Sequence, residues 1–113
     1  MIKIFHNNRC LKSRETCSLL DNMKEAYETV EYLKNPPTAK ELKGLLKMLG
    51  MKASELIRKK EPIYEQKYAG KKLKEDQWIK AMVDNPILIE RPIVVKGKKA
   101  VIGRPPANVK KLL

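Results

Sequence analysis

The sequence is poor in aromatic residues, histidine and cysteine. Aromatic residues make up 5% of the 113 residues, and the chain contains one histidine and two cysteines. Single-stranded nucleic acids bind proteins largely by stacking bases on aromatic side chains, so this shortage disfavours a base-stacking surface. No apolar run approaches the roughly 18 residues of a membrane-spanning helix. We therefore expect neither a nucleic-acid-binding protein nor a membrane protein.

The two cysteines, Cys10 and Cys17, do not form a disulfide framework of the kind found in small secreted proteins. Met1-Ile2-Lys3 leads directly into a strand-like run without a secretory pattern, so we expect a cytoplasmic protein with free thiols. If the segment between the cysteines is helical, they lie about 10 Å apart along the helix, beyond the usual span of a disulfide. We predict that Cys17 is a core residue.

The formal charge of +12 suits an anionic partner, either a nucleic acid or a small oxyanion. Twenty of the 25 basic residues are lysines, spread from Lys3 to Lys111 without a block of five. This distribution also fits lysines that simply solvate the surface. Together with the few aromatic residues, it favours an oxyanion over a nucleic acid.

Hydrophobic periodicity predicts a strand over 2–5, a helix from about 13 to 24 and a second strand over 27–33, which together form a βαβ unit. A β-branched run predicts a hairpin with arms over 93–95 and 100–102. A short helix over 105–113 is expected to follow. The middle region is predicted to be helical, with helices over 38–49, 54–60 and 74–83 and a less regular stretch over 64–70. Thr38 and Glu41 have the spacing of a capping box at the start of the first of these helices, and Gly50 is expected to end it.

The resulting order, β-α-β, helices, then β-β-α, is that of the thioredoxin-like sandwich. We therefore predict an α/β fold with a thioredoxin/glutaredoxin-like mixed sheet and a helical insert between the second and third strands. The expected organisation is a single domain over 1–113, with a βαβ half over 1–35, the insert over 38–85 and a ββα half over 91–113. The fold alone does not identify a function.

The polar loop from His6 to Arg14 holds Cys10 at the start of the first predicted helix. Unpaired N–H groups at a helix N-terminus carry partial positive charge and lower the pKa of a cysteine there. We therefore predict a thiolate nucleophile at Cys10; the alternative is an inert, buried thiol.

The five arginines are placed where an oxyanion site needs them, since arginine holds oxyanions in a planar bidentate fork. Arg9 and Arg14 flank the cysteine segment, and Arg58 lies in the helical insert. Arg91 and Arg104 each precede a proline, which predicts extended or turning backbone at the two ends of the hairpin. We expect their side chains to converge at one end of the sheet; the alternative is ordinary surface arginine.

Several segments, all in order between Ile2 and about Leu112, resemble the glutaredoxin-linked arsenate reductase family. The segments are His6-Asn7-x-x-Cys10-x-x-Ser13-Arg14, Tyr32-Leu33-x-Asn35-Pro36-Pro37, Leu56-Ile57-Arg58-Lys59, Asn85-Pro86-Ile87-Leu88-Ile89-x-Arg91-Pro92-Ile93-Val94-Val95 and Gly103-Arg104-Pro105. The chain departs from the family pattern at three positions, where Asn8 replaces a proline and Leu11-Lys12 replaces small residues.

The resemblance implies a nucleophile at Cys10 and an oxyanion-binding triad of Arg58, Arg91 and Arg104. It also implies a supporting set, in which Pro92 occupies the family's cis-proline position and is expected to be cis. The supporting residues are His6, Asn7, Ser13, Arg14 and Pro92. His6 is expected to lower the pKa of Cys10 or to fill the loop, and Ser13 to donate to the thiolate, to cap the helix, or both.

The implied reaction is the reduction of arsenate to arsenite through a covalent Cys10 adduct, with glutathione as co-substrate and glutaredoxin as the final reductant. It needs no metal or prosthetic group, and we expect a monomer. Two alternatives remain open. One is a regulator of the Spx type that binds RNA polymerase, although such regulators often carry a second cysteine where this chain has Ser13. The other is a thiol oxidoreductase acting on a non-arsenic substrate.

Overall fold

The computed structural model describes residues 2–7 and 9–112. The chain divides into two compact units: a sheet unit, Met1–Asn35 with Arg91–Leu113, and a helical unit, Pro36–Glu90. The predicted halves 1–35 and 91–113 make up the sheet unit, and the predicted insert 38–85 falls within the helical unit. That the whole chain forms a single domain stays a prediction. Within the described residues, no helix combines the length and the apolar character needed to cross a bilayer.

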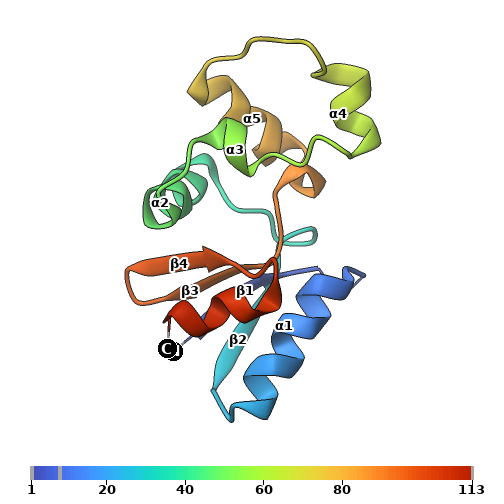
Figure 1. Cartoon of the computed structure of the whole chain (residues 1–113). Coiled ribbons are helices and arrows are strands. Elements are labelled where there is room, and N and C mark those ends of the chain that lie inside the picture. The colour runs from blue at the N-terminus through green and yellow to red at the C-terminus, as the bar shows by residue number, and fades with distance from the viewer. Residues whose placement is uncertain (1, 8, 113) are drawn as a thin grey trace. The chain divides into compact units, whose positions relative to one another are not determined.

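A four-stranded mixed sheet organises the sheet unit (Figure 1). Its strands, in chain order, are β1 (Ile2–His6), β2 (Tyr27–Glu31), β3 (Ile93–Lys96) and β4 (Lys99–Ile102). The spatial order is β2-β1-β3-β4, with β1 and β2 parallel and the other two pairs antiparallel. This arrangement confirms the predicted α/β fold.

Strand register determines which residues gather at one edge of this sheet. His6, the last residue of β1, pairs with Glu31, the last residue of β2. Phe5 pairs with Ile93, the first residue of β3, and Ile93 pairs in turn with Ile102, the last residue of β4. The loop that follows His6 therefore starts at the same edge of the sheet as the segments that carry Arg91 and Arg104.

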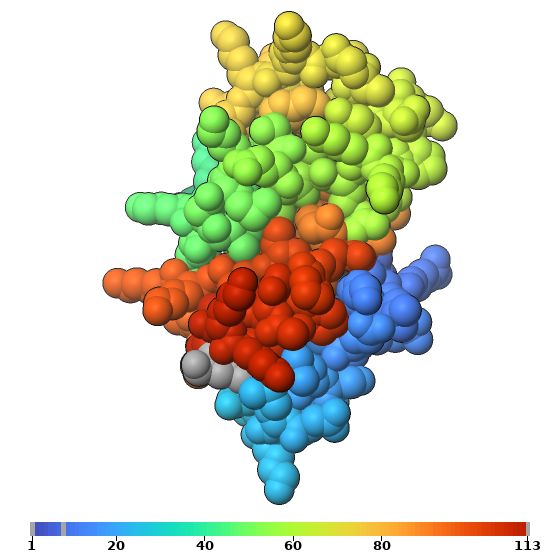
Figure 2. Space-filling model, viewed as in Figure 1, coloured from blue at the N-terminus to red at the C-terminus, as the bar shows by residue number. Residues whose placement is uncertain are grey.

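Two helices cover one face of the sheet: α1 (Leu11–Asn22) and a 3₁₀ helix, η2 (Pro106–Leu112). Figure 2 shows the C-terminal segment, in red, lying against α1, in blue. Side chains alternate along β1, so that alternate residues point into the core while Lys3 is exposed. The core cluster on this face comprises Ile2, Ile4, Leu20, Val94 and Val109.

Element boundaries in the sheet unit differ from the predicted ones by one or two residues at most positions. Strand β2 ends at Glu31 rather than at residue 33, because the N–H groups of Lys34 and Asn35 both donate to the Glu31 carbonyl and close a turn. The C-terminal segment is helical as predicted, but it is a 3₁₀ helix rather than an α-helix.

The helical unit contains α2 (Ala39–Leu49), α3 (Ala53–Leu56), α4 (Pro62–Lys67), α5 (Glu75–Asp84) and a short 3₁₀ turn, η1 (Pro86–Leu88). The predicted caps of α2 are confirmed, because Thr38 and Glu41 form a capping box and Gly50 ends the helix with φ of +68°. In α5, Trp78 is buried and its ring lies 6.2 Å from the rings of Tyr64 and Tyr68, measured between centroids.

The helix predicted over 54–60 is wrong beyond its first turn. Helix α3 ends at Leu56, and Ile57 has an extended backbone that forms an antiparallel bridge with Ile89. The N–H of Arg58 donates to the Leu88 carbonyl at 2.7 Å. Arg58 therefore lies on an extended segment, and the pairing with residues 30 or more positions away overrides the local helical pattern.

Candidate active site

Cys10 occupies the N-cap of α1, at the end of the loop that follows β1. Its backbone is extended, its N–H donates to the Asn7 carbonyl at 3.0 Å, and its own carbonyl accepts from the Arg14 N–H at 3.1 Å. The predicted position of Cys10 at a helix start is therefore confirmed. The residue is 7% exposed, so the sulfur lies in a largely enclosed environment.

The surroundings of Cys10 favour its thiolate form. Burial alone would raise the pKa of the thiol, since it penalises the charged form. The backbone N–H of Ser13, the Arg91 side chain, the charge of Arg104 and the backbone N–H of Lys12 all act in the opposite direction. Their sum prevails, and the pKa of Cys10 lies below its usual value. The helix start and the two arginines thus prepare a nucleophile.

Arg104 contacts the sulfur directly. Its Nη2 lies 3.0 Å from Cys10 Sγ, and its Nε donates to the Arg91 carbonyl at 2.7 Å. The hydrogen bond to the Arg91 carbonyl fixes the guanidinium against the backbone that leads into the hairpin. Arg91 and Arg104, 13 residues apart in sequence, are therefore both held at the thiol, as the sequence predicted for the end of the sheet. Their role in binding an oxyanion stays a prediction.

The backbone at both arginines turns through a cis peptide bond. The predicted cis bond between Arg91 and Pro92 is confirmed, and the bond between Arg104 and Pro105 is cis as well. The sequence pattern indicated only non-helical backbone at Arg104.

Gly103 is a residue that the sequence reasoning did not single out for packing. A Cβ at this position would lie 2.7 Å from Thr16 Oγ1 and 2.9 Å from Pro92 Cγ, closer than side-chain carbons approach other atoms. The Gly103 N–H also donates to the Pro92 carbonyl at 2.9 Å. The absence of a side chain lets α1 and Pro92 approach the segment that carries Arg104. The signals in the sequence were its place directly before Arg104 and its presence in a segment shared with the family.

The loop that presents Cys10 is held by its own polar side chains. Asn7 is buried, and its Oδ1 accepts from the Arg9 N–H at 2.9 Å while its N–H donates to Ser13 Oγ at 3.4 Å. Ser13 is fully buried, so its hydroxyl holds the loop while its backbone N–H acts on Cys10. Arg14 is exposed on α1. Asn8 lies outside the described residues.

His6 is buried at the end of β1, and its described side-chain contact is with Cys17, at 3.8 Å between Nδ1 and Sγ. Cys17 is half-buried at the edge of the core, so the prediction of a core residue holds in part. Burial raises the pKa of Cys17, Tyr27 lowers it and Asp21 raises it; the net direction is upward. The pKa of Cys17 is therefore shifted in the opposite direction to that of Cys10.

Tyr32 is a second residue to which the sequence assigned no role at the site, although it lies in a predicted strand and in a segment shared with the family. It directly follows β2 and is 1% exposed. Burial alone would lower the pKa of Arg91, but interactions with Tyr32 and Cys10 raise it above the usual value. The phenol thus belongs to the group of side chains around the thiol.

Arg58, the remaining arginine of the predicted triad, belongs to the helical unit. There it forms two ion pairs, from Nε to Glu61 at 3.1 Å and from Nη1 to Glu90 at 2.6 Å. Its side chain is 18% exposed. Its participation in an oxyanion site with Arg91 and Arg104 stays a prediction. Among residues 2–7 and 9–112, no cluster of three or more His, Cys, Asp or Glu side chains is placed to hold a metal ion.

Comparisons with known proteins extend these observations. The model of the ArsC family matches residues 5–112. The chain belongs to the ArsC family. Uncharacterized protein YfgD of Escherichia coli K12 is 53% identical over 110 residues, which cover 96% of this chain and 92% of that protein. An arsenate reductase of Neisseria meningitidis is 41% identical over 114 residues, covering 99% and 97% of the two chains.

The solved arsenate reductase of Vibrio cholerae superimposes on this ArsC-family chain with a TM-score of 0.95 and 41% identity, covering 99% of this chain and 97% of that one. The predicted thioredoxin-like fold of the family is thereby confirmed. Membership of the ArsC family supports a thiol oxidoreductase, in agreement with an ionisable cysteine held between two arginines.

Replacing Arg104 with glutamine is expected to raise the pKa of Cys10, because the substitution removes a positive charge and a charge-assisted hydrogen bond from the sulfur. Thiolate is the form present above the pKa, so alkylation of Cys10 slows as pH falls through that pKa. In the variant this fall begins at higher pH, and alkylation near pH 7 is expected to be roughly tenfold slower. Iodoacetamide kinetics across pH measure the shift.

The matched control for this prediction is Arg9→Gln. It also removes one positive charge, but from an exposed side chain of the loop that holds Cys10. Its alkylation profile is expected to follow that of the wild type. Equal shifts in the two variants would mean that general positive charge, rather than the Arg104 contact, lowers the pKa of Cys10.

Proposed function

We propose that this ArsC-family protein reduces arsenate to arsenite through a covalent adduct on Cys10, with glutathione and glutaredoxin as reductants. The observation that carries the proposal is the contact of the Arg104 guanidinium, at 3.0 Å, with a sulfur whose pKa is lowered. A thiolate supplies the nucleophile, and the arginines supply the positive charge that an oxyanion requires.

Arsenate resembles phosphate and carries between one and two negative charges near neutral pH. In the proposal, Arg91 and Arg104 bind its oxygens beside the thiolate, and Arg58 completes the triad. The ion pairs of Arg58 use Nε and Nη1, so Nη2 is the group assigned to the anion. The arginines then offset the negative charge that otherwise repels the attacking sulfur.

The proposed reaction uses one electron pair and two thiols. Cys10 Sγ forms a bond to arsenic(V), and one oxygen takes up a proton and leaves as water. The glutathione thiolate then attacks Cys10 Sγ, the sulfur–arsenic bond breaks, and its electron pair stays on arsenic, which leaves as arsenite. Glutaredoxin reduces the resulting mixed disulfide by attacking the glutathione sulfur, which regenerates the Cys10 thiolate.

The supporting residues have distinct proposed roles. Asn7 and Ser13 keep the loop in the shape that places Cys10 at the start of α1. Pro92 directs Arg91 toward the thiol, and Arg14 adds positive charge on the exposed side of α1. His6 is proposed to fill the start of the loop, where its ring contacts Cys17. In the proposal, no metal or prosthetic group takes part and the protein acts as a monomer. The reaction takes place in the cytoplasm, where glutathione keeps thiols reduced.

The test is a coupled assay with arsenate, glutathione, glutaredoxin, glutathione reductase and NADPH. We expect NADPH oxidation that depends on this protein and stops when arsenate, glutathione or glutaredoxin is omitted. Oxidation that proceeds equally without arsenate contradicts the proposal and favours a thiol oxidoreductase for another substrate. Retention of RNA polymerase by the immobilised protein, without arsenate turnover, would instead favour the regulatory alternative.

A further inference from the structure

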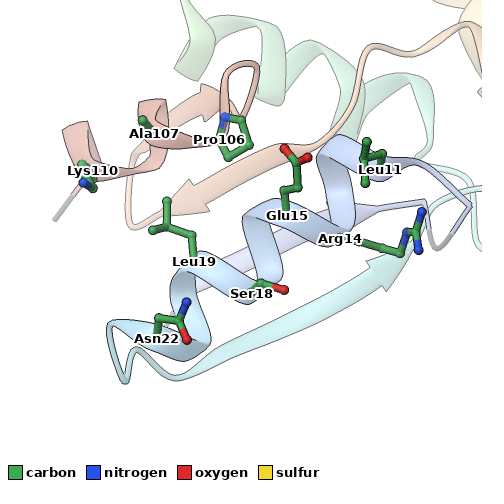
Figure 3. A pocket seen from close by; sticks show the side chains of 9 residues that line it. All are labelled: Leu11, Arg14, Glu15, Ser18, Leu19, Asn22, Pro106, Ala107 and Lys110. Atoms are coloured by element: carbon green, nitrogen blue, oxygen red, sulfur yellow. The ribbon is translucent and has the colours of Figure 1, made fainter.

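A groove of about 500 Å³ runs along the outer side of α1, between this helix and η2 (Figure 3). The α1 residues that line it recur every three or four positions and so form one face of the helix. The opposite wall comes from Pro106, Ala107 and Lys110 of η2. The α1 wall consists of Leu11, Arg14, Glu15, Ser18, Leu19 and Asn22.

The groove begins next to the reactive cysteine. Leu11 directly follows Cys10 in the chain and is 57% exposed, the highest value among the exposed large hydrophobic residues that the structure describes. Leu19, Pro106 and Ala107 continue the apolar surface along the groove. The near end of the groove is therefore one residue from the cysteine in the chain.

Charge indicates what kind of surface fits there. The sheet unit contains thirteen Lys and Arg residues and five Asp and Glu residues, a formal charge of +8. Two of the basic side chains, Arg14 and Lys110, line opposite walls of the groove, and Glu15 is its one acidic lining residue among those described. An acidic partner surface is therefore attracted to this side of the unit.

We propose that this groove is the docking surface for the protein dithiol that reduces the Cys10 mixed disulfide. The partner is a thiol-disulfide exchange protein with an apolar side chain beside its reactive cysteine, which packs on Leu11 and Leu19, and with acidic residues that pair with Arg14 and Lys110. The inference rests on the proposed function, which requires such a reductant. Docking there brings the partner's thiolate to the disulfide, and two electrons pass to it as the partner is oxidised.

The test begins from preformed disulfide between Cys10 and glutathione, so it does not depend on arsenate. Its reduction by glutaredoxin is followed as a second-order rate and compared with its reduction by dithiothreitol, which needs no docking surface. We expect Leu11→Gln to slow the glutaredoxin reaction roughly tenfold, because the side chain loses apolar contact area, and to leave the dithiothreitol rate within about twofold. Met23→Gln, which changes an exposed apolar residue just beyond α1 and outside the groove, is expected to leave both rates unchanged.

Charge is tested separately with Lys110→Glu. We expect a slower glutaredoxin reaction than in Lys98→Glu, a variant with the same charge change at an exposed residue of the hairpin turn. The difference between the two variants is expected to shrink as salt rises, since salt screens exposed charges. Equal rates in the two variants would contradict a charge-guided contact at the groove.

Two results overturn the docking surface. One is a glutaredoxin rate that is unaffected by both Leu11→Gln and Lys110→Glu. The other is equal slowing with glutaredoxin and with dithiothreitol, which places the effect on Cys10 itself. Failure of the proposed function looks different: the coupled assay shows no dependence on arsenate, while the preformed disulfide still reports how glutaredoxin docks.

Discussion

Replacement of Cys10 by serine is expected to abolish arsenate-dependent NADPH oxidation, with a loss of at least about 10³-fold. A serine hydroxyl is not ionised near neutral pH, so the helix start and the two arginines have no anionic nucleophile to stabilise. The hydroxyl also cannot form the sulfur–sulfur bond through which glutathione removes the adduct. The coupled assay measures the loss, and trapping with iodoacetamide verifies that the reactive thiol has gone.

The chain supplies its own control in Cys17→Ser. This substitution also removes one thiol, but from a half-buried position where burial raises the pKa of the group and keeps it protonated. We expect activity within about threefold of the wild type, since the Cys10 contacts with Arg91 and Arg104 do not involve Cys17. Activity that survives in Cys10→Ser but disappears in Cys17→Ser would assign the chemistry to Cys17 instead of Cys10.

Replacement of Gly103 by alanine is expected to lower the free energy of unfolding by about 1–3 kcal/mol and to slow alkylation of Cys10. The added Cβ meets Thr16 Oγ1 at 2.7 Å and Pro92 Cγ at 2.9 Å, so either α1 or the segment before β3 must move. Both carry parts of the site, and a shift of either lengthens the contact between Arg104 and Cys10. Urea denaturation measures the first effect and iodoacetamide kinetics the second.

Gly44 provides the matched control for this substitution. It lies inside α2 and is exposed, and an added Cβ there meets no atom within 4 Å. Gly44→Ala is therefore expected to raise the free energy of unfolding by roughly 0.5–1 kcal/mol and to leave Cys10 reactivity unchanged. Destabilisation of similar size in both variants would contradict the packing argument for Gly103.

The parts of the fold that the sequence predicted well are those that depend on neighbouring residues. Helix α2 was predicted with its ends because Thr38, Glu41 and Gly50 form caps within a few residues of the helix. The βαβ order followed from local periodicity in the first 35 residues. By contrast, the helix predicted over 54–60 stops at Leu56 because Ile57 pairs with Ile89, and no local pattern reports a partner that distant.

The residues of the candidate site also divide into those with a local signal in the sequence and those without one. Cys10 at a helix start is a local feature, and the prolines after Arg91 and Arg104 are adjacent signals, so these residues were found. Tyr32 and Gly103 lie in segments shared with the family but were assigned no role, because their importance depends on what packs against them. The family resemblance named Arg58 as part of the triad, but it carried no information about its pairing with Glu61 and Glu90.

The base of the β3–β4 hairpin sets the spacing between Arg91 and Arg104, and its tip does not. Ile93 and Ile102 are paired at its base, beside Arg91 and Arg104, whereas Lys96 and Lys99 close its tip at the far end of the strands. The tip can therefore gain residues, lose charge or carry a label without altering the separation of the two guanidiniums. A change in the length of this turn is therefore expected to cost little free energy and to leave the reactivity of Cys10 unchanged. A one-residue slip of the strand pairing at the base would instead turn the side chains to the other face of the sheet and separate the arginines from the thiol.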